Sequence, residues 1–228
     1  MVSRMSVPFT FEKFLEMLER FNNDWWPLHL VMYALAVTAI YFAFRKTRQS
    51  GKVVTGILVF FWIWVGAVFN LLYFSKLYPM AYLFVVLFML EGIILAVAGL
   101  LLHRLTFRVG ADLFGLAGGI LVIYSLIGYP LIACLTGRGY PHLLLTGMMP
   151  CPTAIFTLGL LLWTEKPIPK IVPVIPVIYA LTGFVPVKLG VVEDIGLIVA
   201  GIVTGLLLVY RDRGLYQHIG KPETLFSQ

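Results

Sequence analysis

Charged residues are scarce in this chain. Asp, Glu, Lys and Arg make up 12% of its 228 residues, whereas a soluble domain has about 25%. Hydrophobic residues make up 60%, and the mean hydropathy is +0.94. This balance excludes a water-soluble globular fold and predicts an integral membrane protein whose principal partner is the lipid bilayer. The net charge of +6 does not indicate nucleic acid, because basic residues in short loops set membrane topology.

Cysteine is equally rare. Cys134 and Cys151 are the two in the chain, and both fall in apolar segments, so no disulfide framework is expected. The N-terminus lacks the pattern of a signal peptide, because charged residues such as Glu12, Lys13 and Glu16 interrupt its apolar positions. The sequence also lacks linkers, low-complexity tracts and a convincing internal repeat. We therefore expect one compact unit, without the inverted repeats of many transporters.

Long apolar runs are what the sequence has in abundance, and a spanning helix needs about 20 such residues. We predict an all-α polytopic transmembrane bundle of about seven spans, at residues 25–44, 53–74, 79–102, 111–135, 143–163, 171–187 and 191–210. The sixth should be kinked or broken, because it contains Pro173, Pro176 and Pro186. The predicted domains are an amphipathic segment (1–24), the bundle (25–210) and a cytoplasmic tail (211–228).

Residues 9–23 carry the spacing of an amphipathic helix. Apolar positions recur at i, i+3, i+4 and i+7, charged residues occupy the other face, and Thr10 is suited to cap the N-terminus. We expect an interfacial helix that lies flat beside the first span. The alternative is a lid or a helix that docks a partner.

Basic residues predict the orientation of the bundle. The richer side carries Arg45, Lys46, Arg48, Lys52, Arg104, Arg108, Lys166, Lys170, Arg211, Arg213 and Lys221. The poorer side carries Arg4, Lys13, Arg20, Lys76, Arg138 and Lys188. Positive residues favour the cytoplasmic side. We therefore expect a multi-pass protein of the cell membrane (inner or plasma membrane), with its N-terminus outside and its C-terminus in the cytoplasm.

A cysteine between two prolines marks the best candidate site. Pro150 and Pro152 flank Cys151 within an apolar run, and each proline lacks an N–H and restricts the residue before it. We expect an interrupted helix here. Freed backbone carbonyls are tolerated in lipid only where protein or water meets them, so this stretch should be buried in the bundle or should line a cavity.

Sulfur-based chemistry is one interpretation of that site. Thioether and thiolate sulfur bind soft metal ions, which makes Cys151, Met148 and Met149 candidate ligands, with His142 nearby in sequence. The spacing is not diagnostic, and methionine in an apolar run most often fills gaps. Cys151 with His142 is also a candidate thiolate pair, but an enzyme is less favoured than a non-enzyme. Apart from a soft metal ion, no cofactor is expected.

Carboxyl groups supply the other candidates. Glu91 lies deep in the third span, where a charge is costly. It is either a proton or cation relay, or a protonated or hydrogen-bonded group that holds helices together. Glu193 and Asp194 open the seventh span. There they complement the helix dipole, and Lys188 can pair with one of them, while contact with a substrate or cation is the second choice. Asn70, late in the second span, is a further candidate.

Three functions follow as hypotheses. The first is a small transporter or permeation protein with an outward-facing pocket around Cys151, Glu193 and Asp194. The second is a non-transporting membrane scaffold or assembly subunit. The third is a membrane metal-handling or thiol protein. A transporter should have a polar cavity that reaches Glu91 from outside, whereas a scaffold should have a filled interior.

The sequence resembles an uncharacterised family of multi-spanning prokaryotic membrane proteins, catalogued as a domain of unknown function. The resemblance is carried by Val7-Pro8-Phe9-Thr10, Phe14, Asn22, Trp26-Pro27, Trp62-Ile63-Trp64-Val65-Gly66, Tyr140-Pro141, Pro150-Cys151-Pro152-Thr153, Ile155-Phe156-Thr157, Gly159-Leu160-Leu161, Asp194-Ile195-Gly196-Leu197 and Ala200-Gly201. It implies that Cys151 and Asp194 belong to the family motifs. In that family a histidine often stands where this chain has Asn70, which weakens a shared soft-metal site because an amide is a poor ligand for such ions. No activity is implied.

Overall fold

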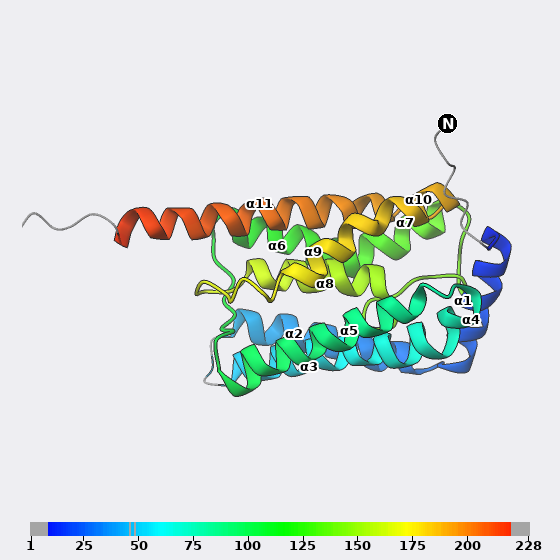
Figure 1. Cartoon of the computed structure of the whole chain (residues 1–228), viewed down its shortest axis with the longest axis horizontal. Coiled ribbons are helices and arrows are strands. Elements are labelled where there is room, and N and C mark those ends of the chain that lie inside the picture. The colour runs from blue at the N-terminus through cyan, green and yellow to red at the C-terminus, as the bar shows by residue number, and fades with distance from the viewer. Residues whose placement is uncertain (1–8, 46, 48, 220–228) are drawn as a thin grey trace, which may run out of the picture.

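The structure, a computed structural model, describes residues 9–45, 47 and 49–219, with the backbone alone for residues 213–219. The helices are α1 (Phe11–Asp24), α2 (Leu28–Phe44), α3 (Ser50–Trp64), η1 (Val65–Phe74), α4 (Ser75–Leu77), α5 (Ala81–Leu95), η2 (Ala96–Leu101), α6 (Leu113–Ile123), η3 (Tyr124–Gly128), α7 (Tyr129–Leu135), α8 (Pro150–Leu162), α9 (Val174–Ala180), η4 (Leu181–Gly183), α10 (Phe184–Leu189) and α11 (Asp194–Ile219). Most lie side by side along one axis, with α1 across one end (Figure 1).

Fewer helices than predicted are long enough to span a membrane. Within the described residues, four are long and apolar enough, at Ser50–Leu77, Ala81–Leu101, Leu113–Leu135 and Asp194–Asp212. A fifth is added if α1 and α2, which meet at an 83° bend, count as one span. The predicted fifth and sixth spans form only the shorter helices Pro150–Leu162 and Val174–Leu189. These lengths therefore support four or five spans rather than seven.

The short helix α8 forms the centre of the bundle. All 13 of its residues are buried, and it packs against α6, α11, α9 and α3. Because neighbouring helices enclose it on every side, α8 needs no length to match the bilayer. This enclosure explains why an apolar segment predicted as a span is too short to be one.

The two prolines around Cys151 begin a helix instead of interrupting one. Pro150 occupies the first position of α8 and Pro152 the third, where backbone N–H groups have no partner within a helix in any case. The chain runs without regular structure up to this point and as an unbroken α-helix after it. The expected interruption within a helix was therefore wrong, whereas the expected burial is confirmed.

A third proline, Pro130, leaves a backbone carbonyl without its helix partner, and a side chain of a neighbouring helix donates to that carbonyl. Pro130, near the start of α7, has no N–H to donate to the carbonyl of Leu126, and the π-helical segment η3 lies directly before it. The Tyr33 hydroxyl on α2 donates to the Leu126 carbonyl at 3.1 Å. The Thr146 hydroxyl donates to the neighbouring Ser125 carbonyl at 2.9 Å. Side chains thus replace the missing helix bonds, as a lipid environment requires.

The loops predicted to be rich in Lys and Arg meet at one end of the bundle. The Arg108 N–H donates to the Trp163 carbonyl at 2.7 Å, and Arg211 donates to the Thr164 carbonyl at 3.1 Å. This end lies opposite α1 (Figure 1). Four residues of the orientation argument, Arg4, Lys46, Arg48 and Lys221, lie outside the described residues, as do the ends of the predicted segments 1–24 and 211–228.

Helix α1 is fastened to the opposite end. The Thr10 side chain caps it by accepting the Lys13 N–H at 3.4 Å. Its face with Phe14, Leu18 and Phe21 is buried, and its charged face is exposed. Asn22 donates to the Leu143 carbonyl at 2.9 Å and bonds His29 at 2.9 Å through its own carbonyl. The position of α1 on a membrane surface stays a prediction.

Candidate functional site

A tight turn lies shortly before Cys151, which is the second residue of α8. Gly147 has a φ of +81°, and a Cβ there would lie 2.9 Å from the Phe61 ring, so this turn requires glycine. The Thr153 hydroxyl accepts the Gly147 N–H at 2.8 Å and donates to the Met149 carbonyl at 2.6 Å. These bonds hold the first turn of α8, and with it the Cys151 thiol, in one orientation.

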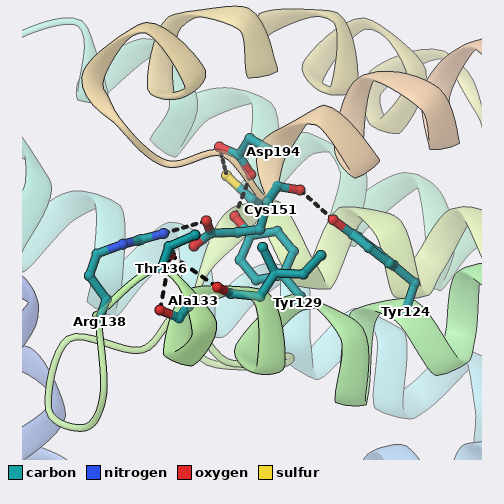
Figure 2. Close-up of polar contacts among 9 residues, drawn as sticks. Tyr124, Tyr129, Ala133, Thr136, Arg138, Cys151 and Asp194 are labelled. Carbon is teal, nitrogen blue, oxygen red and sulfur yellow. Dashed lines mark hydrogen bonds and ion pairs between the residues drawn. The ribbon is translucent and has the colours of Figure 1, made fainter.

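The thiol meets the carboxylate of Asp194 at the start of α11. Cys151 Sγ lies 3.4 Å from Asp194 Oδ2 and 3.3 Å from the Tyr179 hydroxyl. The Tyr129 hydroxyl donates to Asp194 Oδ1. Figure 2 shows Cys151 and Tyr129 both directed at the Asp194 carboxylate. We call Cys151, Asp194, Tyr129 and Tyr179, all buried, the thiol–carboxylate cluster.

The hydrogen bonds of this cluster can all be donated toward the Asp194 carboxylate. When Cys151 donates its S–H to Asp194, its sulfur is left to accept the Tyr179 O–H. Both carboxylate oxygens then accept a hydrogen bond, one from Cys151 and one from Tyr129. This is the arrangement that stabilises an ionised carboxylate, and the N-terminus of α11 adds its positive dipole.

A buried ion pair lies beside the cluster. Arg138 donates through Nη2 to Glu193 Oε2 (Figure 2), and both side chains are almost fully buried. The Tyr124 hydroxyl donates to the Glu193 carbonyl at 2.7 Å. Gly196 makes room for this tyrosine, since a Cβ there would lie 2.2 Å from the Tyr124 ring. The charges of Arg138 and Glu193 offset one another and leave Asp194 without a cationic partner among the described residues.

A cavity of about 210 Å³ adjoins the cluster. Cys151, Asp194 and Tyr179 are among its lining residues, and Phe9 and Phe14 contribute to its wall from the α1 end. About half of the lining residues are aromatic. Apolar walls with a few converging polar groups are the usual features of a small-molecule site.

Several candidate residues lie apart from this cavity. His142 Nε2 lies 3.5 Å from Glu19 on α1, so the structure does not form the predicted Cys151–His142 pair. Lys188 lies over the Phe184 ring at 5.6 Å, and Arg138 takes the place we expected for it beside Glu193. Met148 and Met149, which directly precede Pro150, are fully buried, but they are not among the lining residues.

Glu91 and Asn70 are buried without partners. Both carboxyl oxygens of Glu91, and both the oxygen and the nitrogen of the Asn70 amide, lack a hydrogen bond to any described residue. Neither side chain is among those lining the cavity. The polar passage from outside to Glu91 that a transporter should have is therefore not formed by this cavity.

Sequence reasoning grouped Cys151, Glu193 and Asp194 in one pocket but missed the residues that hold them. Tyr129, Tyr179 and Arg138 come from three separate segments, and none carries a local motif that links it to Cys151. The one available signal was Arg138 itself, a lone arginine after Gly137 between two apolar runs. The described residues contain no group of three or more His, Cys, Asp and Glu side chains that could hold a metal ion.

Fold and site together define a class: a helical bundle with several apolar helices of membrane-spanning length, compatible with an integral membrane protein, and a buried polar cluster at one end. Residues 11–218 match the model of a family of unknown function, DUF6064. The chain belongs to this family. No curated protein and no solved structure matches the chain.

Proposed function

We propose that the chain is an integral protein of the cell membrane that binds a small solute and mediates its permeation, with the cavity at Cys151 and Asp194 as its outward-facing site. The observation that carries the proposal is the meeting of this cavity with the thiol–carboxylate cluster. A buried carboxylate and thiol beside an apolar cavity are costly for a purely structural element, because desolvated polar groups oppose folding.

The proposed orientation follows from the distribution of charge. The loops rich in Lys and Arg lie at the end away from the cavity, which would place the cavity end outside. Helix α1 would then lie in the outer interface. Phe9 and Phe14 at its start would form part of the cavity wall.

The test fills the cavity without touching the cluster. Val185 lines the cavity and is half-buried, so Val185→Trp should occupy the space that a solute needs. In proteoliposomes, uptake from a panel of small solutes should exceed that of protein-free liposomes and should fall to background in Val185→Trp. Val199→Trp is the matched control, because Val199 lies on the outer surface of the bundle, 49% exposed. Equal flux with and without protein would overturn the permeation proposal.

A scaffold subunit is the second candidate. The complete burial of α8 and the separation of Glu91 from the cavity favour it, since both leave the centre of the bundle filled. A scaffold would be recovered from native membranes in a fixed ratio with one partner after crosslinking. A chain recovered alone from such membranes, with solute flux that Val185→Trp blocks, would rule the scaffold out.

A further inference from the structure

The described residues that line the cavity include an acidic side chain and no basic one. Among the described residues that line it, Asp194 is the one with a charged side chain, and no lysine or arginine is present. The nearby Arg138 is already committed to Glu193. An ionised Asp194 carries a negative charge, and the N-terminus of α11 offsets about half of it. In that state the part of the cavity that Asp194 lines carries a net negative potential.

The aromatic wall of the cavity is suited to a positively charged ligand. Phe69 and Phe74 pack with ring centroids 6.0 Å apart, and Phe14 meets Phe74 at 6.4 Å. Phe84, another lining residue, meets Tyr179 at 5.7 Å. The faces of aromatic rings attract cations, most strongly where water is excluded. A neutral ligand would gain the burial of its apolar surface but not this electrostatic attraction, and an anionic ligand would be repelled by the ring faces.

We propose that the solute is a small organic cation, an amine or quaternary ammonium compound, held between the aromatic wall and the Asp194 carboxylate. This inference rests on the proposed function, because it names the substrate class of the same cavity. Asp194 lines the cavity together with Cys151 and Tyr179. The cation is therefore attracted through a low-dielectric interior, in which charges interact more strongly than in water.

The experiment compares a cation with a neutral molecule of the same shape. Tetramethylammonium and tert-butanol have nearly the same size, and purified full-length protein in detergent is titrated with each by equilibrium dialysis. Tetramethylammonium should bind, and tert-butanol in excess should not displace it. Asp194→Asn should weaken the binding of the cation by about tenfold or more. Phe84→Leu, which removes one ring of the wall, should weaken it by about fivefold to thirtyfold.

Matched variants guard against a general loss of structure. Asp24→Asn removes a half-exposed carboxylate at the same end of the bundle, outside the cavity. Phe60→Leu removes an exposed ring elsewhere. Neither should change the affinity for tetramethylammonium. Because Phe84→Leu leaves the polar cluster intact, it tests the proposal even if Asp194→Asn fails to fold.

The outcomes separate this inference from the proposed function. If tert-butanol binds as well as the cation and Phe84→Leu weakens both, the cavity is a site for neutral solutes. The cation inference then falls, while the proposed function stands. If neither compound binds and Val185→Trp leaves solute flux unchanged, the cavity has no ligand and both proposals fall. Binding of the cation alone, lost in Asp194→Asn, supports both.

Discussion

The Cys151 sulfur lies 3.4 Å from the Asp194 carboxylate, although 43 residues separate them in the chain. Cys151 is the second residue of α8 and Asp194 is the first residue of α11. These two helices pack against one another. Their meeting is therefore fixed by where two helices begin. Changes near either helix start should disturb the pair, whereas changes further along should not.

The buried ion pair should dominate the stability of the cavity end. Arg138→Gln leaves Glu193 buried without its cation, and we expect a loss of about 3–5 kcal/mol in unfolding free energy. Arg20→Gln, at the exposed pair with Asp24, should cost less than about 1 kcal/mol. Thermal or denaturant unfolding in detergent measures both. The double variant Arg138→Met with Glu193→Leu should recover most of the loss, and failure to recover would contradict this account of the pair.

The two free cysteines should differ in reactivity. Cys134 is exposed and Cys151 is buried, so a membrane-permeant maleimide should label Cys134 much faster than Cys151 in the folded protein. Both should react after denaturation. Mass spectrometry of labelled peptides measures the difference, and Cys134→Ser provides the background in which Cys151 is the one remaining thiol. Rapid labelling of Cys151 in native protein would show that the cluster is open, contrary to the geometry described.

Tyr33 and Pro130 should be coupled across two helices. Tyr33→Phe removes the donor to the Leu126 carbonyl and should destabilise the protein by about 1 kcal/mol. Pro130→Ala restores a backbone N–H that can donate to the same carbonyl. In that background Tyr33→Phe should cost measurably less. Additive effects of the two substitutions would mean that the tyrosine bond does not compensate for the proline.

Glu91 should be a cost to stability. Its two carboxyl oxygens have no hydrogen-bond partner among the described residues, and such a group in an apolar interior is unfavourable. We expect Glu91→Leu to be neutral or to stabilise the fold by about 1–3 kcal/mol. Glu16→Leu, on the exposed face of α1, should change stability by less than about 0.5 kcal/mol. Clear destabilisation by Glu91→Leu would point to a partner for the carboxyl.

Helix α1 should depend on one amide. Asn22 bonds the Leu143 carbonyl and His29, so Asn22→Ala should leave α1 less tightly held against the loop before α8. Hydrogen exchange of residues 11–24 should then rise while that of α8 stays slow. Asn23→Ala, next to it but exposed, serves as the control. Unchanged exchange in Asn22→Ala would mean that Phe14, Leu18 and Phe21 hold the helix alone.

Part of this arrangement was predictable from residue pattern. Periodicity and hydropathy identify the long helices, and the proximity of Cys151 to Asp194 follows once their segments start at the same end. The number of spans was overestimated, because hydropathy does not distinguish α8, enclosed by protein, from a helix in contact with lipid. Pro150 and Pro152 signal a helix start as readily as a kink, and only the surrounding chain decides between them.

The partners of the cluster were beyond such reasoning. Tyr129 reaches Asp194, Tyr179 reaches Cys151 and Arg138 reaches Glu193 through tertiary packing. Their sequence neighbours are ordinary apolar and small residues. Lys188 was the nearer cation in sequence, but α10 directs it toward Phe184. Sequence distance is thus a poor guide where short helices reverse the chain.

The complete burial of α8 bears on how the protein is made. Its walls come from α3 and α6, which are synthesised before it, and from α9 and α11, which emerge from the ribosome afterwards. Until α11 arrives, one side of the central segment has nothing of its own chain to touch. A nascent chain halted short of residue 194 should therefore remain sensitive to quality-control proteases, and resistance should appear in a single step as the last helix docks.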